Sequence, residues 1–572
     1  MPFPSDLPRR PEERVLRQLV AALLFEGIVD ARAEPAGDAQ RFSWTAGDAA
    51  FRCRGTAGPF GRLRIAPGSV EMLAPNGIWV PADAGPLVRR LPTPDAHKPA
   101  LLAELERTAA LCRWNDANLP RGDRRGLSFP DLEGALEEGH PYHPCFKARL
   151  GFSDADHAAF GPEAGEAFQL VWLLVAGPHL HRALPDGEAA FWRAELGEAA
   201  WAALERRRTE LGIGWSDYGL LPLHPWQWTA LRDGALAPWL ADGRAVALGP
   251  LGDRYRASQS VRTVMNVDDP CKADVKLAMN IVNTASRRTI EPHSVCTAPV
   301  LSRWLTAVVE GDPLFADTFP LAILPEYAGV IADRAGPLAG QLAALWRRSV
   351  ATTLRDGEAA VPFNALMVTE ADGRPFIDPW LAAHGLRPWL ERLFAVAVLP
   401  VWHLLVHHGI AVEAHGQNMI LVHRDGWPER LVLRDFHESV EYVPDFLRDP
   451  ALVPDFASLN PVYRGAPPDR YYWSGDVDAL RELVMDTLFV YNLTELSHLL
   501  AVFHGLPERS FWKQVHDALE GYARRHDPDG RHWRIGHAAP EILTESLLRG
   551  KLLRARDELH HTVPNVFATF SA

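Results

Sequence analysis

The stretch that decides the fold reads EAHGQN at residues 413–418, MILV at 419–422 and LVLRDF at 431–436. Two apolar runs joined through a polar turn with Asp425-Gly426 are typical of a β-hairpin. Asn418 and Asp435 would then meet at the open end of that hairpin, where their oxygens suit a Mg²⁺ ion carrying the phosphates of a nucleotide. His415, just before them, could donate to a phosphate oxygen.

The order of these parts along the chain carries a second signal. A helix, a His-containing loop with Asn, a hairpin and then Asp follow one another in kinase-like enzymes, where they hold metal and phosphates. We therefore interpret residues 413–435 as a nucleotide–metal site. The alternative for this stretch alone is an ordinary hairpin with polar residues at its open end, because short motifs often match by chance.

Composition limits the class of protein. The chain has 572 residues, of which 47% are hydrophobic and 23% charged, so a folded soluble protein of about three structural units is expected. The net charge of −13 argues against nucleic acid or an anionic membrane as the main partner, since both favour a basic surface. Small anionic substrates remain compatible, because a few arginines can form a positive pocket.

Cysteine usage and the N-terminus indicate the compartment. The five cysteines are scattered and include no Cys-x-x-Cys pair, which fits a reducing cytoplasm and offers no zinc site. The N-terminal apolar run lacks a small-residue cleavage signal, so we expect no secretory peptide and a cytoplasmic location.

Residues 394–412 approach the length of a bilayer span but contain Pro400, His403 and His407. We expect a buried amphipathic helix there rather than a membrane span. His403 and His407 lie one helical turn apart, and we expect them to be packed helix histidines rather than metal ligands.

The pattern of elements predicts an α+β fold. We expect a scaffold and lid at residues 1–130, a middle unit at 131–345, and a last unit at 346–572 that contains the opening stretch. Helical spacing or continuous apolar character predicts helices at residues 11–26, 168–175, 477–504 and 540–557.

The first cationic segment of the middle unit reads GHPYHPCFKARLGF at residues 139–152. Its two His-Pro pairs favour extended backbone, which would point Lys147 and Arg149 to one face. Two cations that project together suit a carboxylate or a phosphate. A solvated basic edge is the alternative.

The second cationic segment covers residues 253–290. One strand would present Ser258, Ser260 and Arg262 on one face, with Thr263 at its end, and the next strand would present Lys276, Asn280, Thr284, Ser286 and Arg288. Hydroxyls and three cations on one surface form a cradle for anions. A half-exposed antiparallel sheet with a polar outer face is the alternative.

Together these segments resemble the NRPS-independent siderophore synthetases of the IucA/IucC superfamily. The matching segments stand in the family's order and comprise residues 139–152, 224–227, 260–263, 276–288, 413–418 and 434–436. The resemblance implies a cupped-hand architecture of thumb, fingers and palm, with antiparallel sheets and a distantly kinase-like palm. It also implies an ATP- and Mg²⁺-dependent ligase that adenylates a carboxylate, usually of citrate, releases AMP and pyrophosphate, and joins the acid to an amine or hydroxyl nucleophile. A homodimer is suggested by the resemblance alone.

Site roles follow from the same resemblance. The residues that would bind the ATP phosphates are Ser260, Arg262, Thr263, Lys276, His415 and Gln417, with Lys147 and Arg149 lining the same cleft. Those that would surround the metal are Glu413, Asn418 and Asp435. Arg288 and Thr284 would lie where the carboxylate meets the α-phosphate and would act in catalysis with Arg262 and His415. The sequence does not show whether Arg287 or Arg288 faces the substrate, and it gives His437 and Glu438 no role.

Two other interpretations remain open. A small-molecule kinase of the aminoglycoside-phosphotransferase type accounts for the His-to-Asp spacing but leaves residues 139–152 and 260–288 unexplained. A non-enzymatic protein that binds a carboxylate or an iron chelate accounts for the anion cradle but not for the Mg²⁺-type ligands. The sequence identifies neither the nucleophile nor the acid, which is free citrate by preference, or a citryl monoamide or 2-oxoglutarate.

Overall fold

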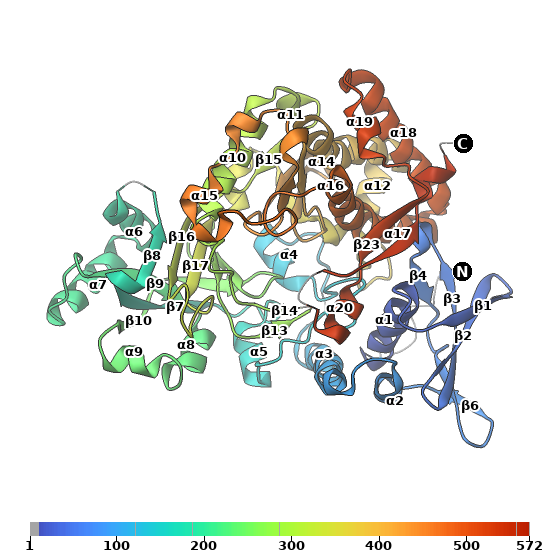
Figure 1. The fold of residues 1–572 in the computed structure, drawn as a ribbon, viewed down its shortest axis with the longest axis horizontal. Coiled ribbons are helices and arrows are strands. Elements are labelled where there is room, and N and C mark those ends of the chain that lie inside the picture. Colours follow the sequence, from blue (N-terminus) through green and yellow to red (C-terminus); the bar gives the residue numbers. More distant parts are fainter. Residues whose placement is uncertain (1–10, 121, 186, 285, 556–557, 571–572) are drawn as a thin grey trace.

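The site is built on an eight-stranded antiparallel sheet in the computed structural model, which describes residues 11–120, 122–185, 187–284, 286–555 and 558–570 (Figure 1). Its strands follow the order β8 (Leu180–Ala183), β16 (Glu326–Ala332), β17 (Ala343–Arg347), β12 (Asp274–Leu277), β11 (Thr263–Asn266), β10 (Ala245–Ala257), β7 (Phe168–Ala176) and β9 (Tyr218–Leu223). The edge strand β9 packs against β16 and β17, so the sheet curls into a half-barrel.

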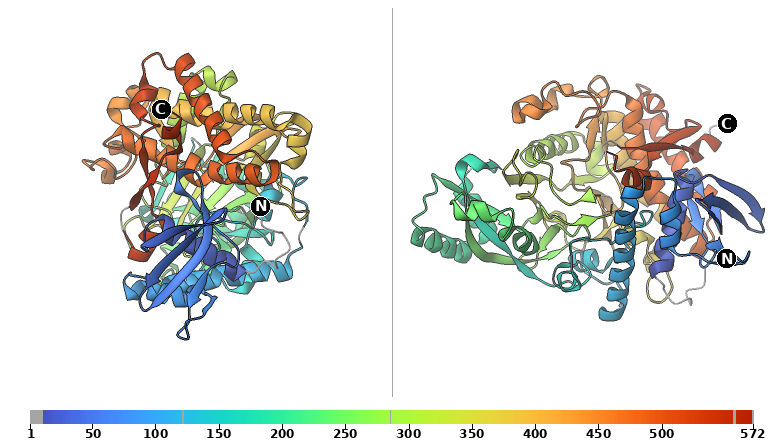
Figure 2. Two further views of the ribbon diagram at one scale, coloured as in Figure 1. Left: turned by 90° about the vertical axis from the view of Figure 1, so that its right-hand side faces the viewer. Right: turned by 60° about the horizontal axis from the view of Figure 1, so that its bottom comes forward.

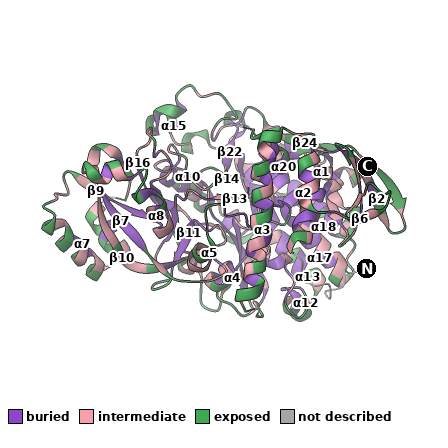
Figure 3. Ribbon diagram, turned by 90° about the horizontal axis from the view of Figure 1, so that it is seen from below, coloured by how far each residue is buried: buried purple, intermediate pink, exposed green. Residues whose placement is uncertain are grey.

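The helix predicted at residues 168–175 is wrong, because these residues form β7 between β10 and β9. Both faces of β7 are buried, and an apolar run buried on both faces has no period that separates strand from helix. The helices around this sheet are α5 (Asp154–Phe160), α6 (Glu188–Leu196), α7 (Glu198–Glu210), α8 (Pro225–Arg232) and α9 (Ala237–Ala241). Figure 3 shows that α7 carries much of the exposed surface at this end of the molecule.

A four-stranded sheet contains the hairpin predicted at residues 419–433. Its order is β15 (Leu321–Ile323), β21 (Trp427–Leu433), β20 (Met419–Arg424) and β18 (Ala359–Pro362). Met419 faces Leu433 across the hairpin, and β15 joins β21 in parallel. The hairpin prediction is confirmed. Helices α10 (Ala298–Gly311) and α11 (Leu314–Asp317) precede this sheet, and α12 (Asp378–His384) follows β18.

One long apolar helix forms the centre of the second half. It consists of α13 (Leu386–Leu393), a π-helical turn (Phe394–Val398), α14 (Leu399–His403) and a second π-helical turn (Leu404–His408). Within the described chain it alone is long and apolar enough to cross a membrane, yet 83% of its apolar window is buried inside the protein. It is therefore a core helix, as predicted, but it ends at His408, and the last predicted residues form strand β19 (Ile410–Val412). Pro400 cannot donate to the helical ladder, and the π turn before it accommodates this break.

The N-terminal part packs against the C-terminal part. Helix α1 (Pro11–Phe25) is followed by a sheet with strands β1 (Ala31–Ala36), β2 (Ala39–Ala46), β3 (Ala49–Ala57), β4 (Leu63–Ile65), β5 (Glu71–Leu73) and β6 (Trp79–Pro81), and then by α2 (Ala84–Arg90) and α3 (Lys98–Asn118). Arg62 and Arg64 both pair with Glu495, at 3.0 and 2.9 Å. Buried apolar residues from both ends of the chain share one core, and Figure 2 shows the two parts side by side.

The C-terminal helices follow the prediction only in part. The helix expected at residues 477–504 is continuous through α16 (Val477–Val484), a π-helical segment (Met485–Leu493) and α17 (Thr494–His504). The helix expected at 540–557 is wrong at its start, where residues form strand β23 (Glu541–Glu545). Helix α20 (Leu547–Leu553) follows, and strand β24 (His560–Pro564) then returns to pair with β23. Exposed and buried residues alternate along β23, which is the period of a strand. Helices α18 (Glu508–His526) and α19 (Arg531–Ile535) lie between α17 and β23.

A buried carboxylate joins three distant segments around the hairpin. Glu133, on α4 (Phe129–Ala135), pairs with the guanidinium of Arg434, and both side chains are almost completely buried. The other oxygen of Glu133 accepts the N–H of Gln259 at 3.1 Å, while Nε of Arg434 donates to the carbonyl of Gln417 at 2.8 Å. Glu133 therefore fixes the β10–β11 turn relative to the loop before β20.

We expect Arg434→Met to lower the free energy of unfolding by about 3–5 kcal/mol, because it leaves Glu133 buried without a counter-charge. The urea midpoint of the purified variant measures this loss. The control is Arg387→Met, because Arg387 pairs with Glu391 at 2.9 Å but both side chains are exposed, so the pair contributes below about 1 kcal/mol. Equal midpoints for the two variants would contradict the role of Glu133.

Candidate active site

The open end of the β20–β21 hairpin brings Asn418 and Asp435 together, as the sequence predicts. The N–H of Arg434 donates to the carbonyl of Asn418 at 3.1 Å, so the residues flanking the hairpin are held side by side. Asp435 has a φ of 64°, which ends the strand in the left-handed region.

Two cations from the eight-stranded sheet hold Asp435. Its Oδ1 accepts Nη1 of Arg347 at 2.8 Å and lies 3.4 Å from Nζ of Lys276. Arg347 also donates to Asp274 at 2.9 Å. Burial alone would raise the pKa of Asp435, but Lys276 and Arg347 hold it well below its usual range. Arg347 was missed from the sequence because it stands in a strand without any motif.

Three cations lie in this region: Arg262 and Lys276 are buried near Asp435, and the half-buried Arg288 lies within electrostatic range of Arg262. Burial lowers the pKa of Arg262, of Lys276 and of Arg288, the last to about 10, and Arg262 repels the other two. Among the described residues, the hydroxyl of Thr263 and Nε of Arg288 are buried without a hydrogen-bond partner. A site that disfavours its own cations and has spare donors is suited to an anion.

The β10–β11 connection corrects one expectation. Residues 258–262 form a tight turn rather than a strand, in which the N–H of Ser258 donates to Thr263 and Val261 has a φ of 67°. Ser260 Oγ accepts the N–H of Thr263 at 3.1 Å. Thr263 lies directly opposite Lys276 on β12, so the two segments are neighbours as predicted. The prediction that alternate residues of 258–262 share one face of a strand is wrong.

The second predicted strand ends early, at Leu277, and a short hairpin follows. Asn280 points away from the cradle, because its side chain donates to Gln341 and its N–H to Gln227. Strands β13 (Val282–Asn283) and β14 (Ser286–Arg287) flank Thr284, whose φ is 56°. Arg287 is exposed, whereas burial and the nearby positive charge of Arg262 lower the pKa of Arg288. The structure therefore favours Arg288 over Arg287.

Residues 144–147 form a turn and Arg149 has a φ of 39°, so the extended backbone predicted to continue through Lys147 and Arg149 is wrong. Lys147 and Arg149 are buried and share one carboxylate, since Glu163 lies 2.6 Å from Lys147 Nζ and 2.7 Å from Arg149 Nη1. Arg149 also contacts His157 at 3.0 Å. One carboxylate neutralises only one of these two positive charges, and a role of Lys147 and Arg149 in binding phosphate stays a prediction.

The loop before β20 positions His415 as a donor. Nδ1 of His415 accepts the N–H groups of Gln417 and Asn418, each at 3.2 Å, which assigns the proton to Nε2. Nε2 lies 3.5 Å from Glu413, and the imidazole is about one-third exposed. A Cβ at the neighbouring Gly416 would lie tightly against Asn364, 3.0 Å from its Cβ, so a larger residue there would have to displace Asn364 slightly.

His437 and Glu438, which the sequence left unassigned, border the same cations. Burial would raise the pKa of Glu438, but His437, Arg262 and Lys276 lower it to about 2. His437 Nδ1 bonds to Glu326 at 2.8 Å. Only the adjacency of these residues to Asp435 could have suggested a role from the sequence.

Four carboxylates form a group that we call the acidic wall: Glu413, Glu441, Glu545 and Glu558. Glu413 and Glu558 act electrostatically on both Glu441 and Glu545, and Glu413 also acts on Arg288. Burial and the neighbouring carboxylates raise the pKa of Glu441 to about 7 and that of Glu545 to about 9. Glu545 and Glu558 line a cavity of about 340 Å³ that also contains the cations Arg287, Lys551 and Arg554. A larger cavity of about 760 Å³, lined by Lys272 and Arg303, contains none of the predicted site residues.

Comparison with known proteins adds family relationships. Residues 128–368 match the IucA / IucC family, and residues 387–560 match a family described as ferric iron reductase FhuF-like transporter. A Bacillus anthracis protein, citryl-spermidine/3,4-dihydroxybenzoyl-citryl-spermidine:spermidine ligase, is 34% identical over 96% of this chain and 92% of its own length.

Two solved structures share the fold. The crystal structure of petrobactin biosynthesis protein AsbB from Bacillus anthracis matches with a TM-score of 0.93 and 32% identity over 98% of this chain and 95% of its own. ATP-bound aerobactin synthetase IucA from Klebsiella pneumoniae has a TM-score of 0.78 at 16% identity, covering 98% of this chain and all (100%) of its own. The second likeness concerns the fold alone. The predicted α+β class with antiparallel sheets is confirmed.

We expect Arg262→Met to weaken the binding of inorganic tripolyphosphate by about tenfold or more, because a buried charge-assisted contact is lost. Thermal shift at increasing tripolyphosphate concentration measures the dissociation constant. Arg254→Met is the matched control, since Arg254 lies on the adjoining strand β10 and pairs with Asp268 at the surface. Equal binding by both variants would remove Arg262 from the anion cradle.

Proposed function

The chain belongs to the IucA/IucC family of siderophore synthetases, which are ligases, and we propose that it uses ATP to adenylate a carboxylate of citrate and then joins it to an amine. One observation carries this proposal: Arg262, Lys276, Arg288 and the unpaired hydroxyl of Thr263 form a cradle of donors, and Glu413 of the acidic wall acts electrostatically on Arg288. Cationic donors are needed to bind the acid and the polyphosphate, and carboxylates are needed to bind a cationic amine.

The first half-reaction joins two anions and therefore needs charge neutralisation. A carboxylate oxygen bonds to the α-phosphorus of ATP, the bond to the β-phosphate breaks, and pyrophosphate leaves with the electron pair. Arg262, Lys276 and the Thr263 hydroxyl are the donors for the phosphates, with Ser260, His415 and Gln417 at the rim. Arg288, at the base of the β13–β14 hairpin, is the donor for the carboxylate, and Thr284, at the turn of this hairpin, is assigned to the same junction by the family resemblance. Alignment and positive charge are the main catalytic contributions.

Oxygen ligands for Mg²⁺ are available at the end of the hairpin. Glu413, Asn418 and Asp435 have the donor types that Mg²⁺ prefers, and Glu438 offers a further carboxylate near the cations. Bound there, the ion would neutralise phosphate charge.

The second half-reaction needs an amine that enters from the acidic wall. The amine nitrogen bonds to the acyl carbon, AMP leaves, and the amine proton is released to solvent. Glu441 and Glu545 share a region of negative potential, so a second ammonium group of the nucleophile would be held while a neutral amine attacks. A polyamine fits this arrangement, and the Bacillus anthracis relative bears the name of a spermidine ligase.

The finer architectural expectations belong to the same proposal. We assign a thumb to residues 1–130, fingers to 131–345 and a distantly kinase-like palm to 346–572, in a cytoplasmic enzyme of siderophore biosynthesis that serves iron acquisition. Homodimer formation is part of this proposal and rests on family resemblance.

With ATP, Mg²⁺, citrate and hydroxylamine, we expect AMP, pyrophosphate and a citryl hydroxamate in equal amounts. Asp435→Asn should reduce turnover at least about a hundredfold, because the change removes a charge while keeping size. Asp268→Asn, at the exposed Arg254 pair, should retain wild-type turnover. Formation of ADP would establish a kinase instead, and citrate binding without any nucleotide product would establish a binding protein.

We expect Glu545→Gln to raise the KM for spermidine about tenfold while leaving the KM for uncharged hydroxylamine unchanged. Glu541→Gln is the control, because Glu541 lies on the same strand but is exposed. Glu441 has a pKa of about 7 and carries charge only above it, so the KM for spermidine should fall as the pH rises through about 7. Unchanged KM values for both spermidine and hydroxylamine in Glu545→Gln would contradict a role of the acidic wall in binding the amine.

A further inference from the structure

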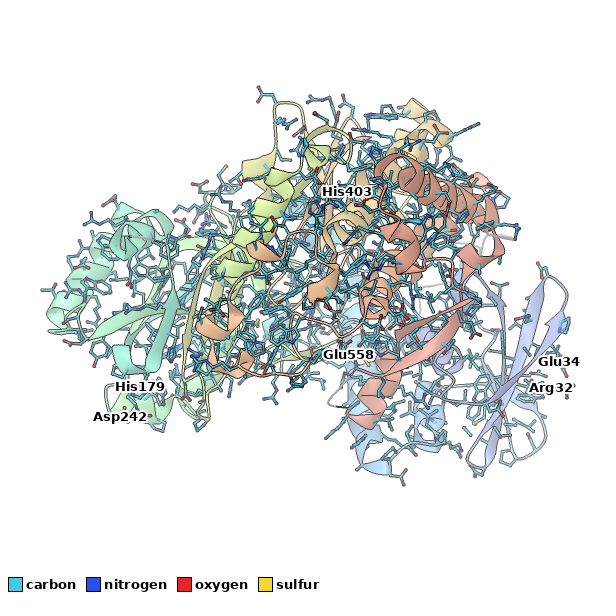
Figure 4. All side chains as sticks on the ribbon, turned by 45° about the horizontal axis from the view of Figure 1, so that its top comes forward. Arg32, Glu34, His179, Asp242, His403 and Glu558 are labelled. Atoms are coloured by element: carbon cyan, nitrogen blue, oxygen red, sulfur yellow. The ribbon has the colours of Figure 1, made fainter. Side chains whose placement is uncertain are left out.

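Four side chains with metal-ligand chemistry meet at the end of the long apolar helix. They are Asp312, which follows α10, and His403, His407 and His408. Each offers one ligand atom, and these atoms lie within 4.8 Å of one another. None belongs to the active site described above, and Figure 4 shows His403 well apart from Glu558 of the acidic wall.

A π-helical turn gathers the three imidazoles. In an α-helix His407 would lie one turn after His403, but His408 would be rotated away from both. Residues 404–408 instead form a π turn, in which the N–H of Gly409 is shared between the carbonyls of Leu404 and Leu405. This widened turn brings residues five apart onto one face. Such turns are rare in proteins, and those that occur often lie at functional sites. The sequence could show only the spacing of the first two histidines.

Asp312 provides the centre on which these nitrogens converge. Its Oδ2 lies 2.9 Å from Nε2 of His403, 2.9 Å from Nε2 of His408 and 4.0 Å from Nε2 of His407. Its other oxygen accepts the N–H of Leu314 at 2.9 Å, which fixes the carboxylate.

The far side of the most buried imidazole is also fixed. Nδ1 of His403 bonds to the hydroxyl of Tyr522, on α18, at 2.8 Å. A hydrogen bond to the nitrogen that does not bind metal is how proteins orient imidazole ligands. The stacked ring of Phe315 closes the cluster beside His408.

We propose that Nε2 of His403, His407 and His408, with a carboxylate oxygen of Asp312, binds one divalent transition-metal ion of the zinc class. Three imidazoles and one carboxylate match the donor types and the number that tetrahedral Zn²⁺ takes, at about 2.0–2.2 Å. His403 is fully buried, whereas His407 exposes 29% of its side chain, so the ion enters past His407. Bound there, it ties the end of α10 to the helix that leads into β19 (Ile410–Val412) and the active-site loop.

A second group of similar chemistry sets the control. His516, Glu520 and His537 also lie within ligand distance of one another, around α18. This group offers three ligands rather than four, and the experiment has to separate the two positions.

The test is a titration of the metal-stripped full chain with Zn²⁺ in competition with a chromophoric chelator, repeated with Co²⁺ to read the visible spectrum. We expect one equivalent of tightly bound metal and a tetrahedral Co²⁺ spectrum. His407→Ala, at the partly exposed ligand, and His408→Gln should each weaken binding by about tenfold or more. His516→Gln should leave affinity and spectrum unchanged, and circular dichroism verifies that each variant is folded.

Three results would overturn the proposal. They are the absence of a tight equivalent in the wild type, equal affinity in the wild type and both helix variants, and loss of binding in His516→Gln alone. In each case Asp312 acts only as a hydrogen-bond acceptor for packed histidines.

Discussion

The active site depends on the guanidinium of Arg347, which bonds to two carboxylates from different parts of the chain. Arg347 links Asp274 of the eight-stranded sheet to Asp435 beyond the β20–β21 hairpin, at 2.9 and 2.8 Å. The planar guanidinium presents separate donors to each oxygen, which a lysine could not do in the same geometry. Through this residue the cation-bearing strands and the oxygen-bearing loop keep a fixed relative position. Glu133 forms a second link of the same kind, because it bonds both to Arg434, the residue before Asp435, and to Gln259.

The charges around this link are arranged to be incomplete. Burial disfavours the charges of Arg262, Lys276 and Arg288, and Arg262 repels the other two, so an anion that enters the cradle stabilises it. Burial and neighbouring carboxylates raise the pKa of Glu441 to about 7 and that of Glu545 to about 9, so near neutral pH Glu545 stays protonated and Glu441 is partly ionised. A carboxylate activated at the cradle and an amine drawn to the acidic wall would meet near Arg288. An acyl-transfer ligase needs its two substrates to meet in this way.

The sequence predicted local elements with turn chemistry better than surfaces that depend on register. Met419–Leu433 formed the expected hairpin, because two apolar runs around Asp425-Gly426 permit little else. The strand at residues 258–262 failed, because Val261 adopts a φ of 67° that no parity argument anticipates. Arg347 and Glu163 could not have been predicted, since their roles come from partners far away in the chain. Family resemblance supplied most of the functional assignment, whereas the residues themselves indicated only a metal and anion site.

The acidic wall also has a consequence for stability. A carboxyl group with a raised pKa binds its proton more tightly in the folded chain than in the unfolded one. For Glu545 the free energy of unfolding therefore falls as the pH rises from the ordinary value of 4.5 towards about 9. Near neutral pH the empty enzyme carries this strain, and an ammonium group beside Glu545 and Glu441 would relieve it by favouring their ionised forms. Affinity for the amine and stability of the empty site are thus coupled through the same carboxylates, so a stronger wall binds the amine more tightly only by destabilising the unliganded fold.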